Sequence, residues 1–363
     1  MRARRLLDSL DLPTIGVSLA LVLTGIFCIA SALAETGGQG SLWRTQLLWL
    51  AIAAVATAVV VAVDYHVWAE VALALHGVSL LLLALTLVFG REIGGNRSWL
   101  VLGPARMQPS ELAKWTTCLV LAVYLARRVH GAAGVRQLIE MAILVGLPAG
   151  LVALQPDMGS ALTFLPIFLA ALLLGGVRWK VIVGLALIGI LLVPAGWMML
   201  ADYQKQRVIT VFDPEHDPSG FGYQVRQSRI AIGSGGLVGN GMFQGTQSQL
   251  EFLPARHTDF VLAVFAEQFG FLGVLGVLAL FYYLFHRGIV AARSSQDRLG
   301  TFICMVVVAW LAGQVALNIG VVLGRFPTIG VPLPLMSYGG SSLLATLCCV
   351  GLIVNVRTRR FVN

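Results

Sequence analysis

The chain has 363 residues, of which 58% are hydrophobic and 12% are charged, and its mean hydropathy is +0.85. A soluble domain carries about 25% charged residues, so this composition excludes a protein whose whole surface faces water. The net charge of +8 does not indicate a nucleic-acid partner, because the basic residues are scattered between apolar segments. The composition is typical of a chain that uses the lipid bilayer as its solvent.

Apolar segments recur along the whole chain, and a membrane-spanning helix needs about 20 mostly apolar residues. The sequence therefore predicts an all-α, polytopic integral membrane protein, with residues 1–363 forming a single membrane domain. The segments 138–154 and 160–175 are short and could form one helical hairpin. About ten spans are expected, near residues 12–34, 43–63, 68–89, 109–128, 138–154, 160–175, 178–201, 259–286, 299–321 and 336–356.

An even number of spans places both termini on one side of the membrane. The short segments on that side hold most of the basic residues, beginning with Arg2, Arg4 and Arg5. The positive-inside rule then predicts cytoplasmic termini in an inner membrane. The long segment 202–258 falls on the outer side, and an extracytoplasmic connection of this length is expected to carry function.

The cysteines fall inside apolar segments, and the chain contains neither a CxxC motif nor a Cys/His spacing typical of zinc sites. The sequence therefore predicts neither a structural metal nor a disulfide framework. We interpret the five residues as buried thiols that pack like small apolar side chains: Cys28, Cys118, Cys304, Cys348 and Cys349.

Two acidic residues mark the span that follows the long outer segment. Asp259 stands where this segment becomes a helix, at a boundary where partial burial raises a carboxyl pKa and favours a general base. A helix cap is the alternative for Asp259. Glu267 lies eight residues further along the same helix, and it is predicted to support the site or to bond to a neighbouring helix.

Three further charged residues precede or begin apolar segments. Glu111 and Lys114 are spaced for an ion pair within one helix, with a phosphate site at Lys114 as the alternative. Asp157 follows Gln155 and Pro156 in a tight outer turn, where it could cap the next helix or face a substrate.

The segment 330–342 is interrupted by prolines and glycines at the outer end of the last span. Irregular backbone at membrane depth is tolerated only where it is buried in protein or lines a cavity. Its polar side chains are therefore candidates for substrate contact, with helix packing through small residues as the alternative. The polar side chains are Ser337, Tyr338, Ser341 and Ser342.

The outer segment also carries basic residues that suit a phosphate group, with a solvated loop surface as the alternative. They are Lys205, Arg207, Arg226, Arg229 and Arg256, of which Lys205, Arg207 and Arg256 are the preferred candidates.

Several short motifs stand in an order that resembles the SEDS family of bacterial shape, elongation, division and sporulation proteins. The resemblance runs through nearly the whole chain, and no single motif carries it. The motifs are Arg97-Ser98-Trp99, Gln108-Pro109-Ser110-Glu111, Gln155-Pro156-Asp157, Gly222-Tyr223-Gln224, Phe252-Leu253-Pro254, His257-Thr258-Asp259-Phe260 and Ser337-Tyr338-Gly339-Gly340-Ser341-Ser342.

Within the family, the segments 233–236, 245–249 and 331–334 are more similar to the elongation (RodA-type) branch than to the division (FtsW-type) branch. The segment 324–330 departs from the usual pattern at Arg325 and Phe326, which keeps the division branch as an alternative. The resemblance implies a peptidoglycan glycosyltransferase that polymerises lipid II during elongation. It also implies a class B penicillin-binding protein as partner, together with other membrane proteins of the elongation complex.

For such an enzyme we expect Asp259 to act as the general base and the substrate to contact a wider set of residues. No cofactor is required by the sequence, although a divalent cation (Mg²⁺ or Mn²⁺) could bridge Asp259 and the lipid diphosphate. A lipid II transporter without catalysis is the rival hypothesis, and a non-catalytic scaffold is a third. The expected substrate contacts are Arg97, Glu111, Lys114, Asp157, Lys205, Arg207, Arg256, His257, Thr258, Ser337, Tyr338, Ser341 and Ser342.

Overall fold

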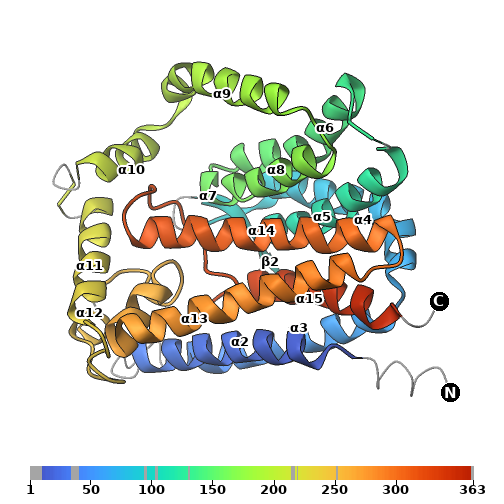
Figure 1. Ribbon diagram of the computed structural model, residues 1–363. Coiled ribbons are helices and arrows are strands. Elements are labelled where there is room, and N and C mark those ends of the chain that lie inside the picture. Colours follow the sequence, from blue (N-terminus) through green and yellow to red (C-terminus); the bar gives the residue numbers. More distant parts are fainter. Residues whose placement is uncertain are drawn as a thin grey trace.

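The computed structural model describes residues 10–33, 41–93, 96–102, 105–129, 131–213, 217–218, 220–250 and 252–360. Long helices form a bundle (Figure 1). Among the described residues, eight helices are long and apolar enough to cross a membrane. They are α2 (Leu12–Ala32), α3 (Leu42–Ala62), α4 (Tyr65–Phe89), α6 (Val135–Ala153), α9 (Trp179–Met199), α13 (Val261–Arg293), α14 (Arg298–Val322) and α15 (Gly340–Arg359).

Two more predicted spans are also helical. α5 (Pro109–Arg128) packs against α4, α6 and α14, and the consecutive α7 (Met158–Leu162) and α8 (Leu165–Leu174) occupy the second half of the expected hairpin. The prediction of an all-α polytopic membrane protein is confirmed. A small antiparallel sheet was not expected; its strands β1 (Arg91–Ile93), β2 (Asn96–Leu102) and β3 (Ala105–Met107) lie between α4 and α5.

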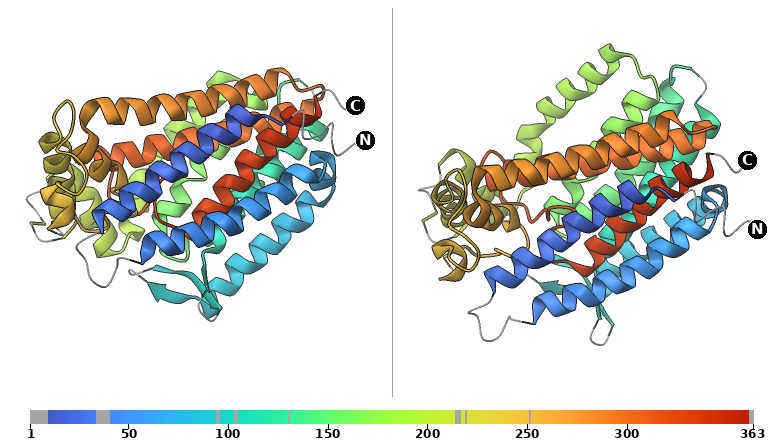
Figure 2. Two further views of the ribbon diagram at one scale, coloured as in Figure 1. Left: turned by 90° about the horizontal axis from the view of Figure 1, so that it is seen from below. Right: turned by 60° about the horizontal axis from the view of Figure 1, so that its bottom comes forward.

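The two ends of the bundle differ in structure. We call the end where α2 begins and α15 ends the terminal end. Asp11 at this end contacts both Arg287 and Arg357. The opposite end, the loop end, carries α10 (Asp202–Phe212), α11 (Phe221–Ser234) and α12 (Thr246–Gln249) (Figure 2). The arginines at positions 2, 4 and 5 lie outside the described residues.

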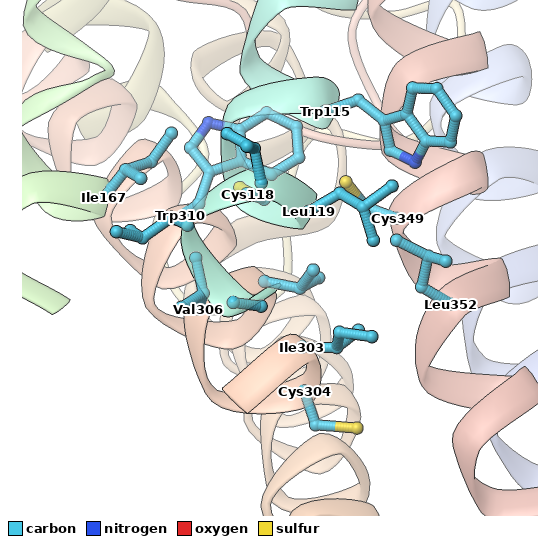
Figure 3. Packing of buried hydrophobic residues seen from close by; sticks show 14 of the residues in the cluster. Trp115, Cys118, Leu119, Ile167, Ile303, Cys304, Val306, Trp310, Cys349 and Leu352 are labelled. Carbon is cyan, nitrogen blue, oxygen red and sulfur yellow. The ribbon is translucent and has the colours of Figure 1, made fainter. Parts of the chain in front are cut away.

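The interior of the bundle is apolar and closely packed. Figure 3 shows Trp115 and Leu119 of α5 among side chains of α8, α14 and α15. Trp310 of α14 is the largest fully buried side chain. All five cysteines are free and buried, as the sequence predicts.

Two helices differ from the rest of the bundle: α13 is not straight, and α9 is not packed among its neighbours. The expected span 259–286 begins at Val261 and is interrupted at Gly270, whose φ of 64° is a left-handed conformation that glycine adopts readily. At this break, the N–H groups of Phe271 and Leu272 donate to the carbonyls of Gly236 and Leu237. The segment after α11 thus supplies acceptors for N–H groups that the interrupted helix leaves without them. By contrast, α9 has no buried residue in its most apolar 18-residue window and stands apart from the bundle (Figure 1).

The terminal end is closed by a buried cluster of charges. The Asp11 side chain is 1% exposed and lies between the Arg287 and Arg357 guanidinium groups, with Arg357 Nε 3.2 Å from Asp11 Oδ2. These contacts join the start of α2 to α13 and α15.

We expect Asp11→Ala to lower the free energy of unfolding by about 3–5 kcal/mol, because it leaves two partly buried arginines without their carboxylate. Asp202→Ala is the control: its carboxylate is 98% exposed and 3.6 Å from Lys205 Nζ, and such a pair contributes about 0–1 kcal/mol. Thermal unfolding of the detergent-solubilised variants measures both. Equal melting temperatures for the two variants would contradict the role given to Asp11.

Candidate active site

Asp259 lies in a turn two residues before α13 begins. The N–H groups of Thr258 and Phe260 both donate to the carbonyl of Ala255, at 3.1 and 3.3 Å. Ala255 has a φ of 50°, which residues with a side chain rarely adopt, so its surroundings must hold this turn. The N-cap of α13 is Phe260, and no side chain bonds to this cap. The Asp259 carboxylate is therefore not a helix cap, and it remains half-buried.

Three consecutive backbone carbonyls of this turn each accept a hydrogen bond from another part of the chain. The N–H of Tyr338 donates to His257 O at 2.8 Å, and Ser337 Oγ donates to Thr258 O at 2.5 Å. Asn318 Nδ2 donates to Asp259 O at 2.9 Å. The position of Asp259 is thus determined by α14 and by the irregular segment before α15.

The irregular segment is itself held by amide side chains. Gln46 Nε2 of α3 donates to Ser337 O at 3.2 Å, and Gln46 Oε1 accepts from the N–H of Gly339 at 3.2 Å. Gln314 Nε2 of α14 donates to Pro332 O at 3.0 Å. Ser337 Oγ also accepts from the N–H of Leu333 at 2.8 Å. Ser337 therefore shapes the segment through its hydroxyl, in addition to any contact that it makes with substrate.

Asp157 is brought to the same place by the turn before α7. Its carboxylate accepts from the Ser160 N–H at 3.1 Å, from Ser160 Oγ at 2.8 Å and from Gln108 Nε2 at 2.9 Å. It therefore caps α7, one of the two roles expected for it. Gly159 allows the close approach: a Cβ there would lie 1.7 Å from the carbonyl oxygen of Ile329, next to the irregular segment.

Arg207 of α10 interacts electrostatically with Asp259 and Asp157. Its guanidinium lies 4.5 Å from the ring centroid of Phe221 and 5.6 Å from that of Tyr203. Tyr203 Oη in turn donates to Pro156 O at 3.3 Å, which ties α10 to the Asp157 turn. The Nε of Arg207 is buried and bonds to no protein atom in the described chain. Burial lowers the pKa of Arg207, opposed by Tyr203, Asp259 and Asp157.

The electrostatics of Asp259 follow from this setting. Burial raises the pKa of its carboxyl to about 6, while the Arg207 charge lowers it and the Asp157 charge raises it. A carboxylate with such a pKa is largely ionised at neutral pH and still basic enough to accept a proton. The site therefore combines a general base with a guanidinium suited to bind an anion.

The remaining predicted residues divide into those near this site and those away from it. His257 contacts Tyr338, with ring centroids 5.7 Å apart, and burial beside Arg256 lowers the pKa of His257. Ser341 Oγ accepts from the N–H of Gln108 at 3.1 Å. Ser341 is thereby joined to Gln108, which bonds to Asp157, and Ser342 is half-buried at the start of α15.

Lys114 and Glu111 form a closed pair within α5. Lys114 Nζ lies 2.7 Å from Glu111 Oε1 and 5.5 Å from the Trp310 ring centroid, and both charged side chains are at least 97% buried. Of the two interpretations, an ion pair within one helix and a phosphate site at Lys114, this geometry matches the ion pair. Elsewhere, Arg97 is exposed on β2, and Lys205 of α10 pairs with Asp202.

Glu267 bonds to the loop end rather than to a neighbouring spanning helix. Its carboxylate accepts from the N–H groups of Gln247 and Ser248, at 2.8 and 3.1 Å, at the start of α12. A Cβ at Gly245 would lie 2.5 Å from Glu267 Oε2, so only glycine fits there without rearrangement. Glu267 therefore anchors the outer segment to α13.

Sequence reasoning missed the buried amides that hold the site, Gln46, Gln314 and Asn318, and named the half-buried Gln108 only as part of a motif. The available signal was an amide inside an otherwise apolar span, since such side chains commonly bond across helices in membranes. Among the described residues, no three His, Cys, Asp or Glu side chains converge as a metal-binding group.

Comparisons with known proteins identify the family of the chain. Residues 12–361 match the family model FtsW/RodA/SpoVE, described as "Cell cycle protein". The peptidoglycan glycosyltransferase MrdB of Escherichia coli K12 is 41% identical over 297 residues, which cover 82% of this chain and 79% of that protein. A probable peptidoglycan glycosyltransferase FtsW of Trichlorobacter lovleyi is 34% identical over 358 residues, covering 95% and 92%.

Two solved structures are similar to the whole chain. One belongs to work on the structural coordination of polymerization and crosslinking by a peptidoglycan synthase complex; its chain is 34% identical, with a TM-score of 0.83 and coverage of 98% and 99%. The other is the crystal structure of the rod shape determining protein RodA from Thermus thermophilus. It is 32% identical, with a TM-score of 0.72 and coverage of 97% and 98%.

We expect Glu267→Leu to accelerate amide hydrogen exchange at Gln247 and Ser248, because these two N–H groups lose their acceptor. Gln268→Leu is the matched control, since the neighbouring buried Gln268 side chain bonds to no protein group among the described residues. Hydrogen-exchange mass spectrometry of peptides spanning α12 measures the difference. Unchanged exchange in Glu267→Leu would show that its carboxylate does not anchor the segment.

Proposed function

The chain belongs to the FtsW/RodA/SpoVE family, and we propose how its residues carry out that family's peptidoglycan chemistry. It is a multi-pass membrane protein and a peptidoglycan glycosyltransferase of cell elongation. Its substrate is lipid II, a disaccharide-pentapeptide carried on undecaprenyl diphosphate. Two substrate molecules meet at the loop end, one as acceptor and one as donor.

Asp259 is the general base of the reaction. Its carboxylate takes the proton of the acceptor sugar 4-hydroxyl, and that oxygen attacks the anomeric carbon of the donor with inversion. The bond from this carbon to the diphosphate oxygen breaks, and the lipid diphosphate leaves with the electron pair. The observation that carries this assignment is an uncapped, half-buried carboxylate whose pKa is raised to about 6.

Arg207 is the principal cation for the leaving diphosphate. It lies close enough to Asp259 and Asp157 to interact with both charges, and its buried Nε has no protein partner in the described chain. A prearranged guanidinium that meets developing phosphate charge is a large catalytic contribution. Arg256 and Lys205 add positive charge to the same outer segment, whereas Lys114 acts by holding Glu111 in α5.

A divalent cation is not required by this arrangement, but one brought by the diphosphate would find ligands. Mg²⁺ is commonly bound by one or two carboxylates together with substrate phosphates. Asp157 and Asp259 are the two carboxylates in place, since their charges interact. The ion would then add Lewis-acid stabilisation to the charge that Arg207 supplies.

The protein works in the bacterial cytoplasmic membrane with its terminal end inside and its loop end outside. A class B penicillin-binding protein crosslinks the strands that it makes, and other membrane proteins of the elongation complex join them. Support comes from the similarity to a chain from a peptidoglycan synthase complex that coordinates polymerization and crosslinking. The distribution of basic residues supports the orientation.

We expect Asp259→Ala to reduce lipid II polymerisation by at least about 100-fold, because positioned general-base catalysis contributes about 10²- to 10⁴-fold. The assay uses purified protein with its class B partner in detergent. Asp202→Ala, which removes an exposed carboxylate of the same outer segment, should retain the wild-type rate. Wild-type rates in Asp259→Ala would exclude this base.

The same preparations separate catalysis from transport. If neither wild type nor Asp259→Ala makes polymer and both move lipid II across liposome membranes, the chain is a transporter.

Folding of Asp259→Ala is checked by thermal unfolding at pH 7.5. Because the folded carboxyl pKa is raised from 3.8 to about 6, stability falls as pH rises between these two values, and the full cost of ionised Asp259 is present at pH 7.5. The variant should therefore melt no lower than wild type.

The polymerisation rate should fall as pH decreases through about 6, because only ionised Asp259 accepts the proton. Below that pH the rate should drop about tenfold per pH unit. Arg207→Leu should move this acid limb to higher pH, since the Arg207 charge lowers the Asp259 pKa. The pH profile of kcat measures both. An acid limb near pH 4 in wild type would contradict a buried base.

A further inference from the structure

One buried amide holds the residue that carries the proposed base. Asn318 of α14 is fully buried, and its Nδ2 donates to Asp259 O at 2.9 Å and to Val331 O at 2.8 Å. The two protons of one amide nitrogen thus join the turn before α13 to the irregular segment before α15. These acceptors lie 59 and 13 positions away in the chain.

We infer that Asn318 is a positioning residue, which fixes the peptide plane of Asp259 and thereby aims its carboxylate at the acceptor hydroxyl; this inference rests on the proposed function of Asp259. Rotating that peptide plane turns the bond from Cα to Cβ of Asp259, and the carboxylate moves with it. Asn318 makes no contact with substrate in this scheme and acts only through Asp259.

The hydrogen bonds from Tyr338 and Ser337 to this turn cannot replace the bond from Asn318 to Asp259 O. Tyr338 N–H and Ser337 Oγ hold the carbonyls of His257 and Thr258, which precede Asp259. Both come from the irregular segment before α15. Among the described residues, only Asn318 donates to the Asp259 carbonyl, and it comes from α14, whose helix is continuous from Arg298 to Val322. The Asn318 amide therefore fixes the position of Asp259 relative to a regular helix.

The second hydrogen bond of Asn318 positions the backbone that lies beside the Asp259 carboxylate. Its acceptor Val331 follows Gly330, which has a φ of 73°. A Cβ at Gly330 would lie 3.9 Å from Asp259 Oδ2, so the backbone there borders the carboxylate directly. One amide thus fixes both Asp259 and the backbone that forms one wall around it.

Among the described residues, the Asn318 amide uses only its donor end. Its Oδ1 is buried and accepts no hydrogen bond from a protein group in the described chain. This acceptor without a partner carries a free-energy cost, whereas the two donated hydrogen bonds satisfy carbonyls that an apolar residue would leave without this donor. The donor geometry toward Asp259 and Val331 is what the amide supplies.

The chain offers a matched control in a second buried asparagine. Asn355 of α15 also donates its Nδ2 to two backbone carbonyls, those of Val60 and Val63, at 2.6 and 2.5 Å. These acceptors lie at the end of α3, at the terminal end. Replacing Asn355 removes the same kind of bonds, and also the bond that its Oδ1 accepts from Arg359 Nε at 2.7 Å, without touching the Asp259 turn.

The test compares wild type, Asn318→Leu, Asn318→Ser, Asn355→Leu and Asp259→Ala as full-length protein with its class B partner. Steady-state polymerisation of lipid II in detergent gives kcat and KM for each variant, and the pH profile of kcat gives the acid limb. Thermal unfolding shows which variants are folded. If Asn318→Leu does not fold, Asn318→Ser carries the test, because its hydroxyl donates one hydrogen bond and its small size avoids a clash.

We expect Asn318→Leu to lower kcat about 10- to 100-fold, because a displacement of about 1 Å at a reacting group has an effect of this size. KM should stay within about threefold, as for an interaction that matters only in the transition state. The acid limb should move to lower pH, because a released carboxylate is less buried. Asn318→Ser should lie between Asn318→Leu and wild type, and Asn355→Leu should keep the wild-type kcat and acid limb.

Two results would overturn the inference without touching the proposed function. One is a wild-type kcat and acid limb in a folded Asn318→Leu protein, with Asp259→Ala inactive. The other is an equal loss of kcat in Asn318→Leu and Asn355→Leu, which would make the bond structural. Wild-type activity of Asp259→Ala would instead remove the proposed function and the inference together.

Discussion

Backbone polar groups inside a membrane protein must find partners within the protein, because the bilayer interior offers none. The helices meet this requirement alone, but the turn before α13 and the segment before α15 do not. Buried amides on α3 and α14 supply the missing donors, through Gln46, Gln314 and Asn318. The irregular backbone can therefore lie among the helices, and it carries Asp259 and Ser337 with it.

Placing a carboxylate in this setting has a consequence for its chemistry. Surrounding protein atoms raise the pKa of Asp259 to about 6, and Arg207 keeps the ionised form accessible at neutral pH. Asp157 is held in the cap of α7 by Ser160 and Gln108 and adds a second negative charge nearby. In the proposed mechanism, the lipid diphosphate adds negative charge to this arrangement of one guanidinium and two carboxylates.

The two ends of the bundle are stabilised in different ways. At the terminal end Asp11 joins α2, α13 and α15 through two arginines. At the loop end Glu267 binds the start of α12, and the break at Gly270 is bonded by residues 236 and 237. Ion pairs thus hold the helices together at one end. Hydrogen bonds to backbone shape the outer segment at the other.

The sequence by itself determined the membrane architecture, because a span of about 20 apolar residues is readable in any chain. It also identified Asp259, Asp157 and Arg207 as candidates, through an ordered set of motifs and the chemistry of their side chains. Only the tertiary structure decided that the charges of these three interact, that Lys114 pairs with Glu111, and that Glu267 bonds to α12. It alone also revealed Asn318, since an amide's partners are backbone carbonyls, and every residue has one. No residue type in the sequence marks which carbonyl a distant helix will face.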